Sequence, residues 1–108
     1  MMKPTRLGSD RSLRIAHQVD GEDSRSVHVD LIPDGTLDLS GHDTGPSVQQ
    51  AWDADVFECG IVFAPADMPG LAFALVAEHY TGDLDAVDKI TKLARRHGIE
   101  AKTWDWAR

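Results

Sequence analysis

The sequence predicts an α+β fold, with an antiparallel sheet of about five strands and two helices packed on one face of it. Three observations lead to this prediction. Apolar and polar residues alternate through much of the first 64 residues, which is typical of strands buried on one side. The Pro-Asp-Gly-Thr turn at 33–36 indicates a hairpin. Apolar residues then recur at helical spacing between Asp67 and Gly98.

Four strands are expected before the helices, over residues 13–19, 27–32, 36–40 and 55–64. The first three form an antiparallel meander, and Ser47 is expected to cap a short helical turn before the fourth. The fourth strand is mostly apolar on both faces, which favours a central position in the sheet. Cys59 shares one face of this strand with Phe57 and Ile61, which predicts a buried, inert thiol.

Two helices and a last strand complete the predicted order ββββααβ. Asp67 is the expected N-cap of the first helix, and Asp83 is the expected N-cap of the second. Gly98 closes the second helix after a basic last turn. The alternation from Ile99 to Trp106 predicts a strand that returns to the sheet.

The chain is expected to form one α+β domain over residues 11–108, preceded by a flexible N-terminus at 1–10. Cys59 is the only cysteine, so no disulfide forms within one chain, and a reducing, cytoplasmic location is expected. The longest apolar run, Leu71 to Ala77, is far shorter than the ~20 residues that span a bilayer, so no membrane partner is expected.

Charge is distributed unevenly along the chain, whose formal net charge is −7. The segment from Ser26 to Asp88 contains twelve acidic residues and no Lys or Arg. This excludes nucleic acid as a favoured partner, because phosphate binding needs clustered bases. It favours a basic protein partner, unless folding places the bases beside the acids and the charge serves solubility alone. The acids expected to bind are Asp30, Asp38, Asp43, Asp53, Asp55 and Glu58.

The stretch "LDLSGHDTGP", from Leu37 to Pro46, has two interpretations. As a site, His42 and Asp43 hold a metal or act as an acid–base pair on a glycine-flanked loop. In the second, structural interpretation, the stretch forms the end of a strand. Gly41 and Gly45 then supply unusual backbone angles, and Asp43 bonds to nearby backbone. The structural interpretation is favoured, because neighbouring side chains on an extended chain point in different directions.

Two further residue groups are candidates for function. His28, Asp30, His42 and Glu58 form a metal site only if the strands bring them together. Trp104 and Trp106 share one face of the last predicted strand, where they pack in the core or, if exposed, form a binding hot spot. The sequence contains none of the common catalytic motifs that we sought, such as a P-loop, GxGxxG or GxSxG.

The chain resembles a group of small uncharacterised bacterial proteins between Val29 and Trp106. The likeness is carried by "LDLSGHDTG", the acidic-aromatic strand "DADVFECGIVF" and the ending "HGIEAKTWDW". Members of the group share an L-x-L-x-G-x-D-x-G motif and a terminal Gly-Ile followed after six residues by Trp. They commonly have Gln where His42 stands here, which counts against His42 as an essential ligand. The resemblance marks Leu39, Gly41, Asp43, Gly45 and Glu58 as pattern positions and implies no chemistry.

These observations lead us to expect a non-enzymatic acidic interaction protein, without a cofactor, that binds a basic partner protein. Inhibitors and immunity proteins of nucleases are one such class. One alternative is a small-molecule or divalent-metal site near His42, Asp43 and Glu58. The other is a homodimer formed through the strand that carries Trp104 and Trp106, so either a monomer or a homodimer is expected.

Overall fold

The computed structural model describes residues 11–107, so the predicted flexible N-terminus at 1–10 lies outside the described residues. The fold is α+β, with a four-stranded antiparallel sheet and three α-helices among the described residues. The chain divides into two compact units, Met1–Pro69 and Gly70–Arg108. The first unit contains the sheet, and the second contains most of the helical hairpin that follows it.

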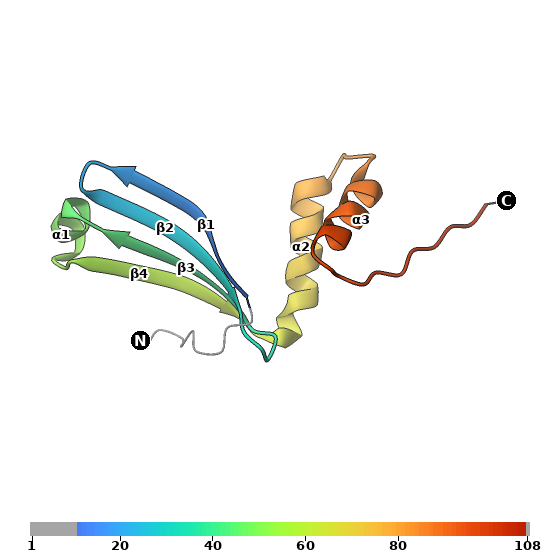
Figure 1. Cartoon of the computed structure of the whole chain (residues 1–108), viewed down its shortest axis with the longest axis horizontal. Coiled ribbons are helices and arrows are strands. Elements are labelled where there is room, and N and C mark those ends of the chain that lie inside the picture. The colour runs from blue at the N-terminus through green and yellow to red at the C-terminus, as the bar shows by residue number, and fades with distance from the viewer. Residues whose placement is uncertain (1–10, 108) are drawn as a thin grey trace. The chain divides into compact units, whose positions relative to one another are not determined.

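The sheet is an antiparallel meander with the strand order β1-β2-β3-β4 (Figure 1). Its strands are β1 (Arg11–Asp20), β2 (Asp23–Leu31), β3 (Leu37–Thr44) and β4 (Val56–Phe63). The predicted hairpin turn at 33–36 is confirmed, and Gly35 takes a positive φ of 96° there. The fourth strand was expected to be central, but β4 lies at an edge of the sheet, because each strand pairs with its neighbour in sequence.

Strand alternation gives the sheet an apolar face and a polar face. Directly paired residues lie on the same face, so the register assigns each side chain. The apolar face carries Leu13, Ala16, Val27, Val29, Leu31, Leu37, Leu39, Phe57, Cys59, Ile61 and Phe63. The polar face carries His28, Asp30, Asp38, Ser40, His42 and Glu58, together with His17 and Ser26.

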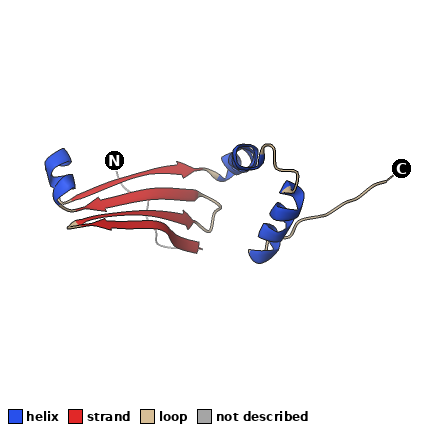
Figure 2. Cartoon of the chain, turned by 90° about the horizontal axis from the view of Figure 1, so that it is seen from above, coloured by secondary structure: helices blue, strands red, loops and turns tan. Residues whose placement is uncertain are grey.

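A short helix, α1 (Pro46–Trp52), connects β3 to β4 and contacts both strands and β2 (Figure 2). Its residue Val48 is buried, which anchors the helix against the sheet. The cap of α1 differs from the prediction. Gly45, with φ 112°, stands at the N-cap, and Ser47 lies within the first turn. The physical reason is that the hydroxyl and backbone N–H of Ser47 both donate to Asp23 on β2.

The second half of the chain forms two helices, α2 (Met68–Tyr80) and α3 (Ala86–Arg96). A single 3₁₀ turn, Pro65–Asp67, precedes α2, so Asp67 lies in that turn and is not the N-cap of α2. The N-cap of α3 is Asp85, because the Asp83 carboxylate accepts the N–H of Asp85 and forms a local turn first. No helix among residues 11–107 is both long and apolar enough to cross a membrane.

The predicted fifth strand is wrong. Residues 99–107 are neither helix nor strand in the structure. Alternation from Ile99 to Trp106 creates a strand only where a neighbouring strand supplies its hydrogen bonds, and none of the described strands pairs with this segment. Trp104 and Trp106 are accordingly 87% and 71% exposed, so neither is a core residue in the described structure.

Candidate functional site: the acidic end of the sheet

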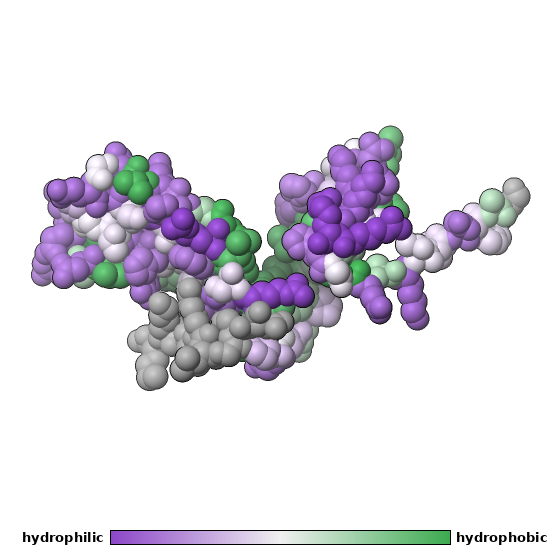
Figure 3. Space-filling view, in the orientation of Figure 1, coloured by the Kyte–Doolittle hydropathy of each residue, from purple (hydrophilic) through white to green (hydrophobic). Residues whose placement is uncertain are grey.

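Six acidic residues meet at the end of the sheet that α1 closes. In the antiparallel meander β1 and β3 end there, and β2 and β4 begin there. We call this group the acidic end, and it consists of Asp20, Glu22, Asp23, Asp43, Asp53 and Asp55. Within segments 20–25 and 43–55, Arg25 is the only Lys or Arg. The part of the surface near α1 is accordingly covered mostly by hydrophilic residues (Figure 3).

Two interactions fix the geometry of the acidic end. Asp23 accepts the backbone N–H of Ser47 at 2.9 Å and also accepts its hydroxyl, which ties the β1–β2 turn to the first turn of α1. Arg25 on β2 lies directly opposite Asp43 on β3, and its Nε is 3.5 Å from Oδ1 of Asp43. This pair is partly exposed, so it contributes little to stability and leaves five acids without that counter-charge.

A hollow of about 390 Å³ lies between α1 and the strand ends. Asp20, Asp23, Asp43 and Trp52 line it, and so does Arg25, which is paired with Asp43. Trp52 is 58% exposed, and its indole stacks on Phe57 with ring centroids 4.4 Å apart and an interplanar angle of 3°. The stack holds the indole in a defined orientation beside the carboxylates. The arrangement suits a cationic side chain, which is attracted both by carboxylates and by an aromatic face.

Asp23 gives the acidic end a testable pH dependence. The two hydrogen bonds from Ser47 hold the pKa of Asp23 below its ordinary value of 3.8. A lowered pKa in the folded state stabilises the fold above the unfolded pKa, and this stabilisation is lost as the pH falls through the folded value. We therefore expect Asp23→Asn to lower the melting temperature at pH 7 and to have progressively less effect below about pH 4.

Thermal unfolding of both proteins from pH 7 to pH 2.5 measures this dependence. Ser47→Ala is the matched variant, because it removes one donor and leaves the carboxylate in place. Its effect should shrink over the same pH range. An Asp23→Asn effect of constant size at every pH would show that the carboxylate charge does not contribute.

The structure separates the six acids that were expected to bind. Asp43, Asp53 and Asp55 lie at the acidic end. Asp30 and Asp38 face each other across β2 and β3 and are 0% and 3% exposed, so they are not available at the surface. Sequence reasoning missed Asp20, Glu22 and Asp23, which it treated only as a turn. The signal was present in "DGEDS", since three acids in one hairpin turn must project together at the end of a sheet.

His42, Asp43 and Glu58 do not converge on one site. His42 and Glu58 are paired across β3 and β4, with 3.0 Å between His42 Nδ1 and Glu58 Oε1. Asp43 follows His42 in the same strand and therefore points to the opposite face. The strand β3 continues to Thr44, so the turn expected at Gly41 and Asp43 is wrong, and the chain bends only at Gly45. The Asp43 side chain pairs with Arg25 instead of bonding to nearby backbone. Cross-strand pairing on both sides keeps Gly41 extended.

The alternative metal set lies on one face of the sheet without forming a cluster. His28, Asp30, His42 and Glu58 all belong to the polar face. His28 lies opposite Ser40, and Asp30 lies opposite Asp38, so the four side chains divide between separate cross-strand pairs. Within residues 11–107, no group of three or more His, Cys, Asp or Glu side chains is arranged to hold a metal ion.

A row across the polar face places Ser26, His42 and Glu58 on adjacent strands. A serine, a histidine and an acid are the components of a nucleophilic triad, so their hydrogen bonds decide what the row can do. Glu58 holds the Nδ1 atom of His42. The Ser26 hydroxyl, however, donates to the backbone carbonyl of His42 at 3.4 Å, so it is directed away from the ring nitrogens. The row is therefore a cross-strand hydrogen-bonded network and not an activated nucleophile.

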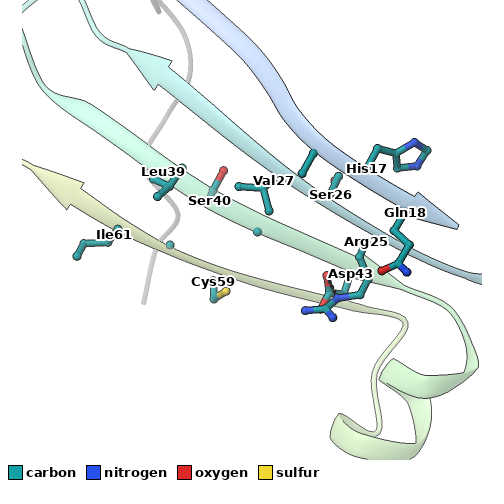
Figure 4. Close-up of a pocket in the computed structure, with 13 residues that line it drawn as sticks. His17, Gln18, Arg25, Ser26, Val27, Leu39, Ser40, Asp43, Cys59 and Ile61 are labelled. Atoms are coloured by element: carbon teal, nitrogen blue, oxygen red, sulfur yellow. Dashed lines mark ion pairs between the residues drawn. The ribbon is translucent and has the colours of Figure 1, made fainter. Parts of the chain in front are cut away.

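The apolar face contains a second hollow, of about 570 Å³ (Figure 4). Val27, Leu39, Cys59 and Ile61 line its apolar part, and the Arg25–Asp43 ion pair lies at one end. Cys59 is exposed, which contradicts the expected burial of its thiol, because β4 is an edge strand. The hollow is suited to apolar contact and brings together no group with evident chemistry.

The fold and the site define a class: a small acidic α+β protein with six of its eighteen acidic residues at one end of an antiparallel sheet. We compared the chain with protein-family models, curated proteins and solved structures, and none of them matches it. The resemblance to small bacterial proteins therefore stays a prediction.

Proposed function

We propose that this chain is a non-enzymatic interaction protein that binds a basic partner protein through the acidic end. The observation that carries the proposal is the location of the charge. Residues 1–69 contain twelve acidic and five basic residues, whereas residues 70–108 contain six of each. The unit that contains the sheet thus carries the whole net charge of −7.

Trp52 supplies an apolar anchor inside this charged surface. Binding energy in protein interfaces is concentrated in a few large side chains, most often Trp, Tyr and Arg. The indole is exposed and held by Phe57, so little conformational entropy is lost when a partner packs on it. An arginine of the partner fits this environment, since it stacks on the aromatic ring and pairs with Asp20 or Asp23.

The partner class that best fits this surface is a protein with a basic site of the kind that binds nucleic acid. Nucleases present such sites, and an acidic inhibitor or immunity protein is attracted to them over long range. The hypothesis competes with the view that acidity only maintains solubility. Asp20, Asp23 and Asp43 line one hollow together with the exposed Trp52, which favours binding, because solubility alone does not require an aromatic anchor.

A salt titration with a nona-arginine peptide tests the proposed function. We expect binding at about 50 mM salt that weakens at least tenfold by about 0.5 M, where the Debye length is only a few ångströms. Trp52→Ala should weaken binding several-fold at both salt concentrations, because the stacking contact is screened less than the ion pairs. Isothermal titration calorimetry measures both effects. Binding that is independent of salt, or equal for a nona-glutamate peptide, would contradict the proposal.

A further inference from the structure

The two edges of the sheet are built differently. β1 and β4 are the edge strands, and no strand among residues 11–107 pairs with the outer side of β4 (Figure 1). β1 has the features that protect an edge, namely a bulge between Arg14 and Ala16 and the charged side chains of Arg11 and Arg14. β4, with the sequence "VFECGIVF", has no bulge in its register, no proline and a single charged residue.

The single charge of β4 does not guard its edge. Glu58 is directed toward β3, where its carboxylate lies 3.0 Å from the Nδ1 atom of His42. Val56, Ile61 and Val62 are 44%, 51% and 48% exposed. A long apolar strand with an open hydrogen-bonding edge is a template for pairing with another strand. An exposed edge of this kind that is neither blunted nor covered promotes aggregation.

We propose that the outer edge of β4 pairs with β4 of a second copy of this chain, so that two sheets join into one continuous antiparallel sheet. Antiparallel pairing of identical edges follows from a two-fold axis perpendicular to the sheet, which is a closed arrangement. This axis keeps the two apolar faces on the same side. Odd-numbered residues therefore pair with odd-numbered residues, and even-numbered with even-numbered. The overlap of Val56–Phe63 with its copy is longest when the pairing centres on Cys59 or on Gly60.

Both registers make the edge self-complementary. With the axis at Gly60, Phe57 lies opposite Phe63 of the second copy and Glu58 lies opposite its Val62. With the axis at Cys59, Glu58 lies opposite Gly60. The two Glu58 carboxylates are never directly opposite each other, so the pairing avoids the like-charge contact that destabilises a sheet.

This association goes beyond the proposed function, and the two respond to salt in opposite directions. Each copy carries a net charge of −7, so screening favours the pairing of copies and weakens the binding of a basic partner. We expect light scattering on the full chain to give twice the mass of one chain at about 200 µM, with dissociation on dilution. The dimer fraction at about 0.5 M salt should equal or exceed that at about 50 mM.

Proline substitutions test the edge directly. The N–H and C=O of one strand residue point to one side, and those of the next residue point to the other. Of Ile61→Pro and Val62→Pro, one therefore removes only an outward N–H and leaves the β3–β4 ladder intact. We expect that variant to keep the circular dichroism spectrum and to be a monomer. Gln18→Pro and Val19→Pro on β1 form the matched pair, of which the folded member should remain a dimer.

Cys59 reports on the same contact without mutation, since it is the only cysteine and is exposed. In both registers the two Cys59 residues lie opposite or diagonal to each other, with Cα atoms roughly 4.5 to 8 Å apart. A short bismaleimide should cross-link the dimer, and Cys59→Ser should abolish the product. A monomer at every concentration overturns the proposal. So does a dimer that yields no cross-link, that survives both β4 prolines, or that is lost only when residues 99–108 are removed.

Discussion

Replacing Gly45 by alanine is expected to lower the free energy of unfolding by about 3 kcal/mol. Gly45 has a φ of 112°, which side chains rarely adopt. A Cβ atom there would lie 2.5 Å from the carbonyl oxygen of Glu22 and 2.7 Å from the Cα atom of Asp23. Both neighbours are backbone, so they cannot move without displacing the β1–β2 turn. Strain and steric clash therefore add at one position.

Two other glycines separate these contributions. Gly21 also has a positive φ, of 61°, but nothing lies within 4 Å of a Cβ built on it. Gly21→Ala should therefore cost only about 1 kcal/mol, the strain alone. Gly41 is extended, and its Cβ would meet the Cys59 sulfur at 3.3 Å, so Gly41→Ala tests mild crowding alone. Urea denaturation measures all three. Equal losses for Gly21→Ala and Gly45→Ala would show that the approach of the β1–β2 turn to Gly45 is not a structural constraint.

Gly45 also shows where sequence reasoning succeeded in the glycine-rich stretch and where it failed. The unusual backbone angle at Gly45 was predicted correctly. Gly41, His42 and Asp43 were expected in a turn, but they belong to β3. Glycine and aspartate favour turns locally, and this preference is overridden when a strand is paired on both sides. The pairing partners are far away in sequence, so a local pattern does not reveal them.

The same reason explains the errors at the edge of the sheet. Hairpin signals are local, and the meander from β1 to β3 follows from them. Whether a strand is central or at an edge depends on what pairs with it, and alternation does not specify this. β4 was therefore placed centrally, Cys59 was expected to be buried, and the segment from Ile99 to Trp106 was expected to be a strand.

The acidic character of the candidate site was predicted from the sequence, but its position in the fold was not. A segment without Lys or Arg indicated an acidic surface, yet it could not show which acids are exposed. Asp30 and Asp38 are on the sheet and buried, whereas Asp53 and Asp55 follow α1 and are exposed. Antiparallel topology brings the β1–β2 turn beside α1, which adds acids that lie outside the segment. Topology, and not the density of charge in the sequence, thus defines the acidic end.

Neutralising three exposed acids of this end should weaken binding to a nona-arginine peptide by about tenfold at low salt. The variant combines Glu22→Gln, Asp53→Asn and Asp55→Asn, which preserve the shapes of the side chains. Each lost pairing at an exposed site is worth about 0.5 kcal/mol, so three of them account for the tenfold change. Asn replaces Asp53 without backbone strain, although the φ at this position is 50°, because asparagine tolerates the left-handed conformation.

The decisive comparison is a second triple variant with the same net charge. Glu78→Gln, Glu100→Gln and Asp105→Asn neutralise three exposed acids in residues 70–108. If only the total charge attracts the peptide, both variants lose the same affinity. If the acidic end is the binding surface, the second variant loses less than about twofold, because its charges lie outside the contact. Titration calorimetry at one fixed salt concentration distinguishes these outcomes, and equal losses would contradict the assignment of binding to the acidic end.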